Sequence, residues 1–177
     1  MRSLTATWLS IHRDPQPSEI EEEVTALFHE FRSPLLRYAM SMGVGLSDGE
    51  DVVQEVFLAL YRHLCEGKPR TNLRGWIFRV GHNLVLKRRS EHAFAEEGEV
   101  VESKPNPEQM LASNRRSARL VAAVSALPER DRFCLFLKME GLRYREIAEV
   151  LDMSLGAVAI SLSRSLGKLT VVRERDA

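Results

Sequence analysis

The apolar residues of this chain recur at helical spacing, and nowhere do apolar and polar residues alternate over a length that would suit a β-strand. The clearest stripe has the three- and four-residue spacing of one helix face. Its members are Val52, Val53, Val56, Phe57, Leu60, Tyr61 and Leu64. A length of 177 residues suits one medium domain or two small ones. The pattern predicts an all-α fold built from two small helical domains.

Chain breakers and changes in composition divide the sequence into units. Residues 92–107 are acidic, contain Gly98 and Pro105, and hold few large apolar side chains, which predicts a flexible linker. Asn106 and Pro107 then suit the start of a helix, because proline is tolerated at the first helical position. The predicted units are an N-terminal extension whose order the sequence leaves open (1–18), a first helical domain (19–91), the acidic linker (92–107) and a second helical domain (108–177).

Residues that begin or break helices set the expected boundaries inside these domains. Pro34 lies within the first apolar stripe and is expected to kink or divide that helix. The run from Ser47 to Glu50 has the residue types of a capping box and predicts a helix start there. Further helices are expected at residues 73–89, 108–126, 129–139, 143–151 and 154–171.

The formal net charge is zero, yet the charges are unevenly distributed along the chain. Residues 66–92 hold seven Lys or Arg and two acids, whereas residues 1–24 and 93–110 are each dominated by acids. Separation of this kind allows one basic patch to bind nucleic acid while the whole chain stays neutral. Zero net charge therefore does not exclude a nucleic-acid partner.

Several functional classes find no support in the sequence. Apolar stretches are too short for a transmembrane helix, and the N-terminal residues lack the layout of a secretory signal. Cys65 and Cys134 lie in apolar helical patterns without partners at metal-ligand spacing, which favours reduced thiols in a reducing compartment. The five histidines are scattered, and no Gly-rich phosphate loop occurs. We therefore expect a cytoplasmic protein that is not an enzyme, needs no cofactor or metal and does not insert into membranes.

The last two predicted helices have the spacing of a helix-turn-helix. A short helix over residues 144–151 is followed by a tight turn, after which Ser154 is expected to cap the next helix. Four apolar residues of that next helix are expected to point inward: Val158, Leu162, Leu166 and Leu169. Such a pair can place its second helix in the major groove of DNA, although the same spacing also occurs in purely structural helical units.

Two polar faces of the first domain each allow two interpretations. The first is a group of cations around Trp76: Arg74, Arg79, Lys87, Arg88 and Arg89. This group suits nucleic-acid binding, or else a solvated basic helix with a tryptophan in the core. The second is the exposed side of the preceding helix, with Asp51, Gln54 and Glu55. It suits a docking surface for a basic partner, or else a solvated helix whose acids interact with the helix dipole.

Short stretches of both domains carry a resemblance to a known family. The runs DVVQEVFL (residues 51–58) and LRGWIFRV (residues 73–80) are similar to the second conserved region of bacterial RNA polymerase sigma factors. The runs LPER (residues 127–130) and GLRYREIA (residues 141–148) resemble the fourth region of the same family. The presence of only these two regions, joined by a short linker, resembles the extracytoplasmic-function class.

The resemblance implies a subunit that binds core RNA polymerase, recognises promoter DNA and helps to melt it. In the family, the acidic face docks on the clamp coiled coil of the largest polymerase subunit, which assigns this role to Asp51, Gln54 and Glu55. The resemblance assigns binding of the minus-ten element to a loop at residues 66–72 and to five residues of the helix after it: Arg74, Trp76, Arg79, Asn83 and Arg88. Binding of the minus-thirty-five element falls to Arg143, Arg145, Ser154, Gly156, Ala157, Ile160, Ser161 and Arg164. An anti-sigma factor that sits between the domains is a further expected partner.

The second helix of the helix-turn-helix departs from these relatives. Where the family often has cations, this chain has Ala159, Ser161 and Leu166, so the phosphate contribution to DNA binding is expected to be weak. Helical geometry turns Ile160 outward, where it suits a thymine methyl group or a protein partner. In the first domain, Asn83 and Arg88 hold the positions that the family pattern gives them, but Lys87 stands where the family often has an acid.

Two other functional classes stay open on the sequence. A stand-alone helix-turn-helix regulator would bind duplex DNA without polymerase, but it leaves the face at residues 51–55 and the Trp76 helix unexplained. An enzyme or a purely structural helical module is the third class, and no convergent polar cluster supports an enzyme. Co-purification with core polymerase, followed by run-off transcription, separates the three.

Overall fold

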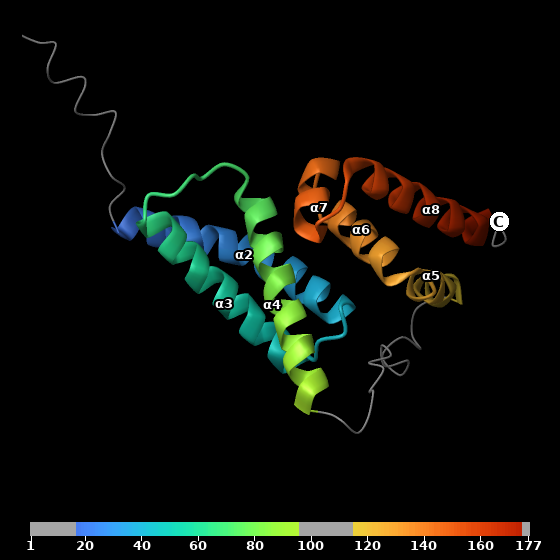
Figure 1. The fold of residues 1–177 in the computed structure, drawn as a ribbon, viewed down its shortest axis with the longest axis horizontal. Helices are drawn as coiled ribbons and strands as arrows, with labels where there is room; N and C mark the ends of the chain where they lie inside the picture. The colour runs from blue at the N-terminus through green and yellow to red at the C-terminus, as the bar shows by residue number, and fades with distance from the viewer. Residues whose placement is uncertain (1–16, 96–114, 175–177) are drawn as a thin grey trace, which may run out of the picture.

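The computed structural model describes residues 17–95 and 115–174, which form helices and short connections with no strand among them (Figure 1). The first range holds α2 (Pro17–Ser41), α3 (Leu46–Cys65) and α4 (Leu73–Ala95). The second range holds α5 (Arg115–Ser125), α6 (Glu129–Met139), α7 (Tyr144–Leu151) and α8 (Leu155–Glu174). The predicted all-α fold is confirmed. The N-terminal extension, most of the linker and the expected cap at Asn106 lie outside the described residues.

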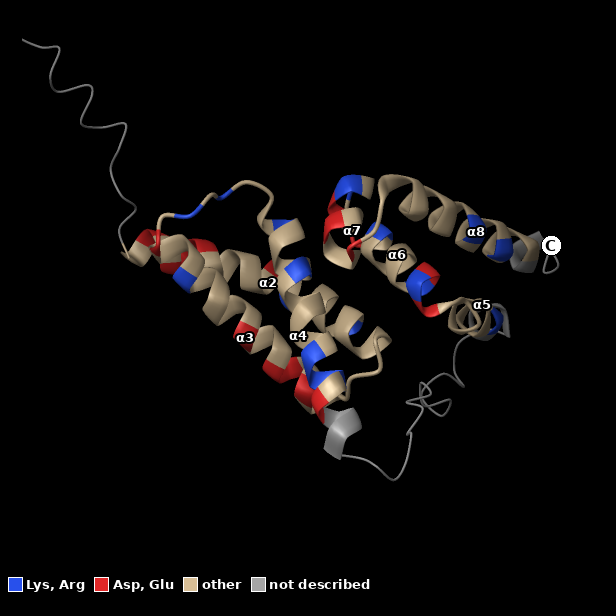
Figure 2. Cartoon of the chain, viewed as in Figure 1, with Lys and Arg blue, Asp and Glu red and all other residues tan. Residues whose placement is uncertain are grey.

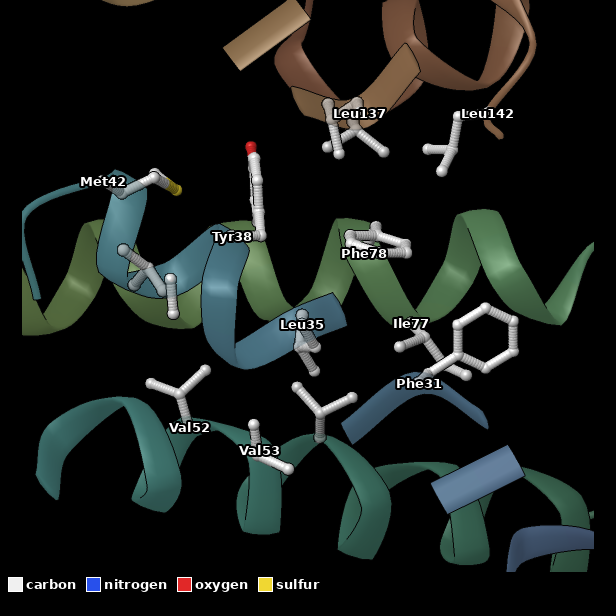
Figure 3. Close-up of a cluster of buried hydrophobic side chains, with 14 of the residues drawn as sticks. Phe31, Leu35, Tyr38, Met42, Val52, Val53, Ile77, Phe78, Leu137 and Leu142 are labelled. Atoms are coloured by element: carbon white, nitrogen blue, oxygen red, sulfur yellow. The ribbon is translucent and has the colours of Figure 1, made fainter. Parts of the chain in front are cut away.

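The helices α2, α3 and α4 pack against one another through their apolar faces (Figure 3). The face predicted for α3 is confirmed, since six of its members are buried: Val52, Val53, Val56, Phe57, Leu60 and Leu64. Leu35 of α2 and Phe78 of α4 are buried completely against the same cluster. Each such side chain stabilises the fold by about 1.5–3 kcal/mol through removal of apolar surface from water. Apolar burial therefore sets how these three helices lie.

One expectation about helix ends in this half is wrong, and another is narrowed. Of the two outcomes expected at Pro34, a kink or a division of the helix, division does not occur. The helix α2 continues through Pro34, because proline removes only one backbone donor and the packed face continues on both sides. The capping box at Ser47 is wrong: α3 begins at Leu46, Gly45 is its N-cap, and no side chain caps it. Gly49 is buried against Leu36 of α2, and a Cβ at this position would lie only 2.8 Å from Leu36 Cδ1. This close packing on α2 sets the position of the first turn of α3.

The helices α7 and α8 form the predicted helix-turn-helix. The turn between them passes through Asp152, whose φ of 50° is a left-handed conformation that aspartate tolerates better than most residues. Ser154 caps α8 as expected, since its Oγ accepts a hydrogen bond from the Ala157 amide at 3.1 Å. At the start of α7, the Glu146 carboxylate accepts a hydrogen bond from the Arg143 amide at 2.6 Å.

The two described ranges also pack directly against each other. The helix α4 contacts α7, and α2 contacts α6. Figure 3 shows Leu137 and Leu142, from α6 and the turn after it, pointing toward Tyr38 and Phe78. The buried apolar residues of both ranges consequently form one continuous cluster. The sequence predicted two domains but did not predict this contact between them.

Candidate nucleic-acid interface

Basic residues recur along the length of α4 (Figure 2), and three of the five are exposed: Arg74, Arg79 and Lys87. Arg79 and Asn83 are exposed and lie one helical turn apart, so they project from the same side of the helix. Trp76 is half-buried: its ring lies 4.8 Å from the His63 ring, centroid to centroid, and it packs against the core while keeping an exposed edge. The helix therefore combines a cation, an amide and a partly exposed aromatic ring, the groups that single-stranded nucleic acid uses.

Two of the predicted DNA-binding arginines already have partners within the protein. Arg88 forms an ion pair with Glu55 of α3. Arg74 lies 3.5 Å from a Glu30 carboxylate oxygen, and its guanidinium carbon lies 5.4 Å from the centroid of the Phe31 ring. Among the described residues, Arg79 forms no ion pair. Binding of a phosphate thus requires partner exchange at Arg74 and Arg88 but not at Arg79.

The predicted docking residues share one side of α3. Asp51 and Gln54 are exposed there, and Glu55 is half-buried by its pair with Arg88. The opposite side of the helix is the apolar face already described. The Glu55–Arg88 pair joins the acidic side of α3 to the basic side of α4, so the two predicted surfaces are neighbours.

A buried carboxylate on α6 organises the second helix of the helix-turn-helix. The side chain of Asp131 is 5% exposed. Its Oδ1 accepts a hydrogen bond from Ser161 Oγ at 2.5 Å, and its Oδ2 lies 3.2 Å from Arg164 Nη1. Its backbone carbonyl accepts a weaker bond from Ser165 Oγ at 3.4 Å. A buried carboxylate without such partners would cost several kcal/mol, so these contacts fix the rotation of α8.

This rotation corrects two expectations about α8. Ser161 is 3% exposed and faces Asp131, so its prediction as a DNA contact is wrong. Leu166, expected to point inward, is 55% exposed, because Ser161 and Ser165 occupy inward positions in their bonds to α6. Ile160 is 60% exposed, which confirms its outward placement.

The exposed side of α8 is almost free of charge, and the helix is mostly tan in Figure 2. Exposed uncharged residues form most of this side: Leu155, Gly156, Ala159, Ile160, Ser163, Leu166, Gly167, Thr170 and Val171. Between residues 155 and 171 the only charged residues are Arg164 and Lys168. Of the other predicted contacts, Arg143 and Arg145 are exposed at the start of α7, and Ala157 is half-buried. The helix offers little to DNA phosphates.

Sequence reasoning missed two buried polar groups. Asp131 lies in helical register with the buried Leu127 and Leu135, and an acid in such a register indicates a buried charge. The other group is Tyr38, whose hydroxyl lies 2.9 Å from Nδ1 of the buried His82 ring. No local pattern predicts that pair, because its members lie on helices that are separated in sequence.

The described residues contain no arrangement for metal chemistry, since no three His, Cys, Asp or Glu side chains are placed to hold an ion. Within the same residues, no helix has both the length and the apolar character needed to cross a membrane. The exposed features are charge on α3 and α4 and an uncharged face on α8, and such surfaces suit binding to macromolecules.

Comparisons with known proteins agree with this organisation. Residues 27–94 match Sigma-70 region 2, and residues 117–169 match Sigma-70 region 4. The ECF RNA polymerase sigma factor SigE of Mycolicibacterium smegmatis is 32% identical over 151 residues, which cover 81% of this chain and 58% of SigE. The RNA polymerase sigma factor CnrH of Cupriavidus metallidurans is 30% identical over 156 residues, which cover 80% of this chain and 82% of CnrH.

Two solved structures share the fold at lower sequence identity. CnrH in complex with the cytosolic domain of CnrY has a TM-score of 0.63 at 24% identity, covering 91% of this chain and 94% of that one. The sigma factor RpoE in complex with the anti-sigma factor NepR, from Bartonella quintana, has a TM-score of 0.64 at 18% identity, covering 89% and 98%. These structures share the helical architecture of both halves.

One family accounts for both halves of the chain. The region 2 match covers α3, nearly all of α4 and the C-terminal part of α2, and the region 4 match covers α7 and most of α8. A stand-alone regulator would not need region 2, so that alternative is set aside. The chain belongs to the sigma-70 family of promoter-directing RNA polymerase sigma factors, in its extracytoplasmic-function class.

Proposed function

We propose that this chain binds core RNA polymerase, directs it to specific promoters and helps to melt the DNA there. The observation that carries the proposal is the order of its surfaces: an acidic helix face, a basic helix beside it, and a helix-turn-helix. The domain boundaries follow the same order, with region 2 at 19–91, a linker at 92–107 and region 4 at 108–177. The protein acts in the cytoplasm as an initiation factor and supplies no catalytic group of its own.

Docking on polymerase is assigned to Asp51, Gln54 and Glu55. Asp51 and Gln54 are exposed and can meet a basic partner directly. Glu55 shares its carboxylate with Arg88, so it links docking on α3 to the DNA-binding side of α4. Opposite charges across such a surface favour encounter and set the orientation of the partners.

Strand opening is assigned to the loop at residues 66–72 and to the exposed side of α4. An unstacked base needs a pocket or an aromatic surface, and stacking supplies about 1–3 kcal/mol per base. Trp76 has an exposed edge near that loop. Arg79 and Asn83 are exposed on the same helix, where they can contact the separated DNA strand. Arg74 and Arg88 can also bind the strand after their ion pairs with Glu30 and Glu55 break.

Recognition of the minus-thirty-five element is assigned to the exposed start of α8. Arg143 and Arg145 can contact phosphates, Ser154 and Gly156 mark the helix start, and Ile160 can meet a thymine methyl group. With so few cations, this half binds duplex DNA weakly by itself. Useful affinity comes from joint engagement with polymerase and with region 2.

Regulation by an anti-sigma factor is part of the proposal. The RpoE structure that shares this fold was solved with the anti-sigma factor NepR. The exposed apolar residues of α8 and the acidic side of α3 give such a partner surfaces to cover. A partner bound there would withhold the same residues from DNA and polymerase.

Replacement of Asp51 by arginine tests docking most cleanly. Asp51→Arg places a like charge against a basic partner, so we expect pull-down of core polymerase to fall by at least about tenfold, since such contacts cost several kcal/mol. Asp51 is preferred over Glu55, because a change at Glu55 would also release Arg88.

Glu22→Arg is the matched control, because Glu22 is an exposed acid at the start of α2, away from the docking side of α3. It should bind polymerase like the wild type. Helical circular dichroism should be the same for both variants. Full binding by a folded Asp51→Arg variant would show that this face does not dock.

A further inference from the structure

A buried polar pair lies in the contact between the two halves. The Tyr38 hydroxyl and His82 Nδ1 lie 2.9 Å apart, and this hydrogen bond joins α2 to α4 where both meet α6. The ring of Phe133 on α6 stands edge-on to both partners, with its centroid 6.2 Å from each of theirs. The imidazole thus forms part of the surface that holds the halves together.

Ion pairs surround this contact. Arg37 of α2 pairs with Glu140 at 3.0 Å, and Arg89 of α4 pairs with Glu129 of α6 at 2.7 Å. All four side chains remain partly exposed, so water screens these pairs and each contributes little. The buried centre of the contact, which holds Leu137 and Leu142 as well as the Tyr38, His82 and Phe133 rings, therefore contributes more to its stability than the rim does.

Water has little access to His82, a residue that is 7% exposed. Burial lowers the pKa of His82, Arg89 on the same helix lowers it further, and Glu129 on α6 opposes them. Among the described residues, no charged group on α3 or α7 adds to this shift. Tyr38 offers a hydroxyl and no counter-charge, because burial and the nearby Cys134 raise the pKa of Tyr38 far above its usual value.

In the structure the helix-turn-helix half packs against α2 and α4, and we call this arrangement the closed state. The closed state is incompatible with simultaneous binding of both promoter elements. Elements centred near minus ten and minus thirty-five are separated by about 25 base pairs, or roughly 85 Å of duplex. Two packed domains of this size have a radius of gyration of only about 14 Å. The helix-turn-helix must therefore leave α2 and α4 before the protein can engage a promoter, a consequence that rests on the proposed function.

We propose that His82 is a proton-sensitive latch: when neutral it holds the helix-turn-helix against the first domain, and when protonated it releases it. Protonation puts a positive charge into an aromatic contact beside Arg89 and makes Nδ1 a donor only. In the open state, in which the two halves have separated, water solvates the charge on His82. The closed state is therefore most stable above the ordinary histidine pKa of 6.5 and weakens as the pH falls from there toward the lowered value.

Small-angle X-ray scattering of the free, full-length chain tests the latch. Between about pH 8 and about pH 5.5, the range in which histidine titrates, the wild-type radius of gyration should rise by roughly 5–10 Å as two packed globules separate. His82→Gln is neutral at every pH and can still hydrogen-bond Tyr38, so it should stay compact at both pH values. His82→Arg carries a permanent charge and should be extended at both.

His29→Gln is the matched control, since His29 is an exposed histidine of α2, and it should expand with acid as the wild type does. Circular dichroism at each pH checks that the helices persist. If His82→Arg fails to fold, the wild type and His82→Gln still decide the matter. A wild-type radius that does not change, or a His82→Gln variant that expands equally, would overturn the latch. Neither DNA nor polymerase is present, so either result leaves the proposed promoter function to its own test.

Discussion

The two helices assigned to promoter DNA, α4 and α8, present opposite kinds of surface. Over residues 73–95, α4 carries five Lys or Arg and one acid. Over residues 155–171, α8 carries only Arg164 and Lys168, and its exposed side is otherwise small or apolar. Figure 2 shows this difference as blue segments on α4 and a mostly tan α8.

The difference indicates a division of labour between the halves. Under the proposed function, attraction to phosphates comes mainly from α4, whereas α8 supplies shape and methyl contacts to base edges. The charge difference is increased by Asp131, because it binds Arg164, one of the two cations between residues 155 and 171 of α8. The helices also differ in how they are held: apolar burial positions α4, and a polar contact helps to orient α8.

The largest expected effect follows from removing the polar contact beneath α8. Asp131→Ala leaves the buried Ser161 hydroxyl without its acceptor and frees Arg164, so we expect a loss of about 2–3 kcal/mol in unfolding free energy. Chemical denaturation followed by circular dichroism measures this. Glu149→Ala, at an exposed site on α7, should change stability by less than about 0.5 kcal/mol. Equal stability of both variants would mean that Asp131 does not anchor the helix.

A smaller effect is expected from the loss of Arg79, the exposed cation of α4 that forms no ion pair among the described residues. Arg79→Ala should weaken open-complex formation by the holoenzyme about tenfold, because a charge-assisted contact is worth roughly 1.5 kcal/mol. Permanganate reactivity of the promoter bubble measures it. Arg62→Ala, an exposed cation on α3, should leave the bubble unchanged. Full strand opening by Arg79→Ala would remove this residue from the minus-ten surface.

The smallest effect is expected from adding to α8 the charge that it lacks. Ala159→Lys with Ser163→Lys should tighten binding of the full chain to duplex DNA and steepen the salt slope by about 0.9 per new phosphate contact. Ser163 replaces Ser161 as the site of change, because Ser161 faces Asp131 and cannot reach DNA. The double glutamine variant is the uncharged control. A wild-type chain that already binds duplex tightly with a steep slope would contradict the contrast between the two helices.

Much of this architecture could be predicted from the sequence, because local patterns encode it. The apolar face of α3, the cap at Ser154 and the short turn before α8 each depend on neighbouring residues. The capping box at Ser47 failed for the opposite reason, since the packing of Gly49 on α2 starts the helix earlier. Local rules therefore worked where no distant contact competed with them.

The sequence alone determined the helices, their order, the family and the separation of charge, since all of these depend on residue type and spacing. Tertiary structure decided which groups lie inside. Ser161 and Leu166 exchange their expected places because Asp131, thirty positions before Ser161, draws one side of α8 inward. Tyr38, His82 and Phe133 meet only when α2, α4 and α6 pack together. Such pairings depend on the relative placement of whole helices, and helical periodicity constrains each helix only with respect to itself.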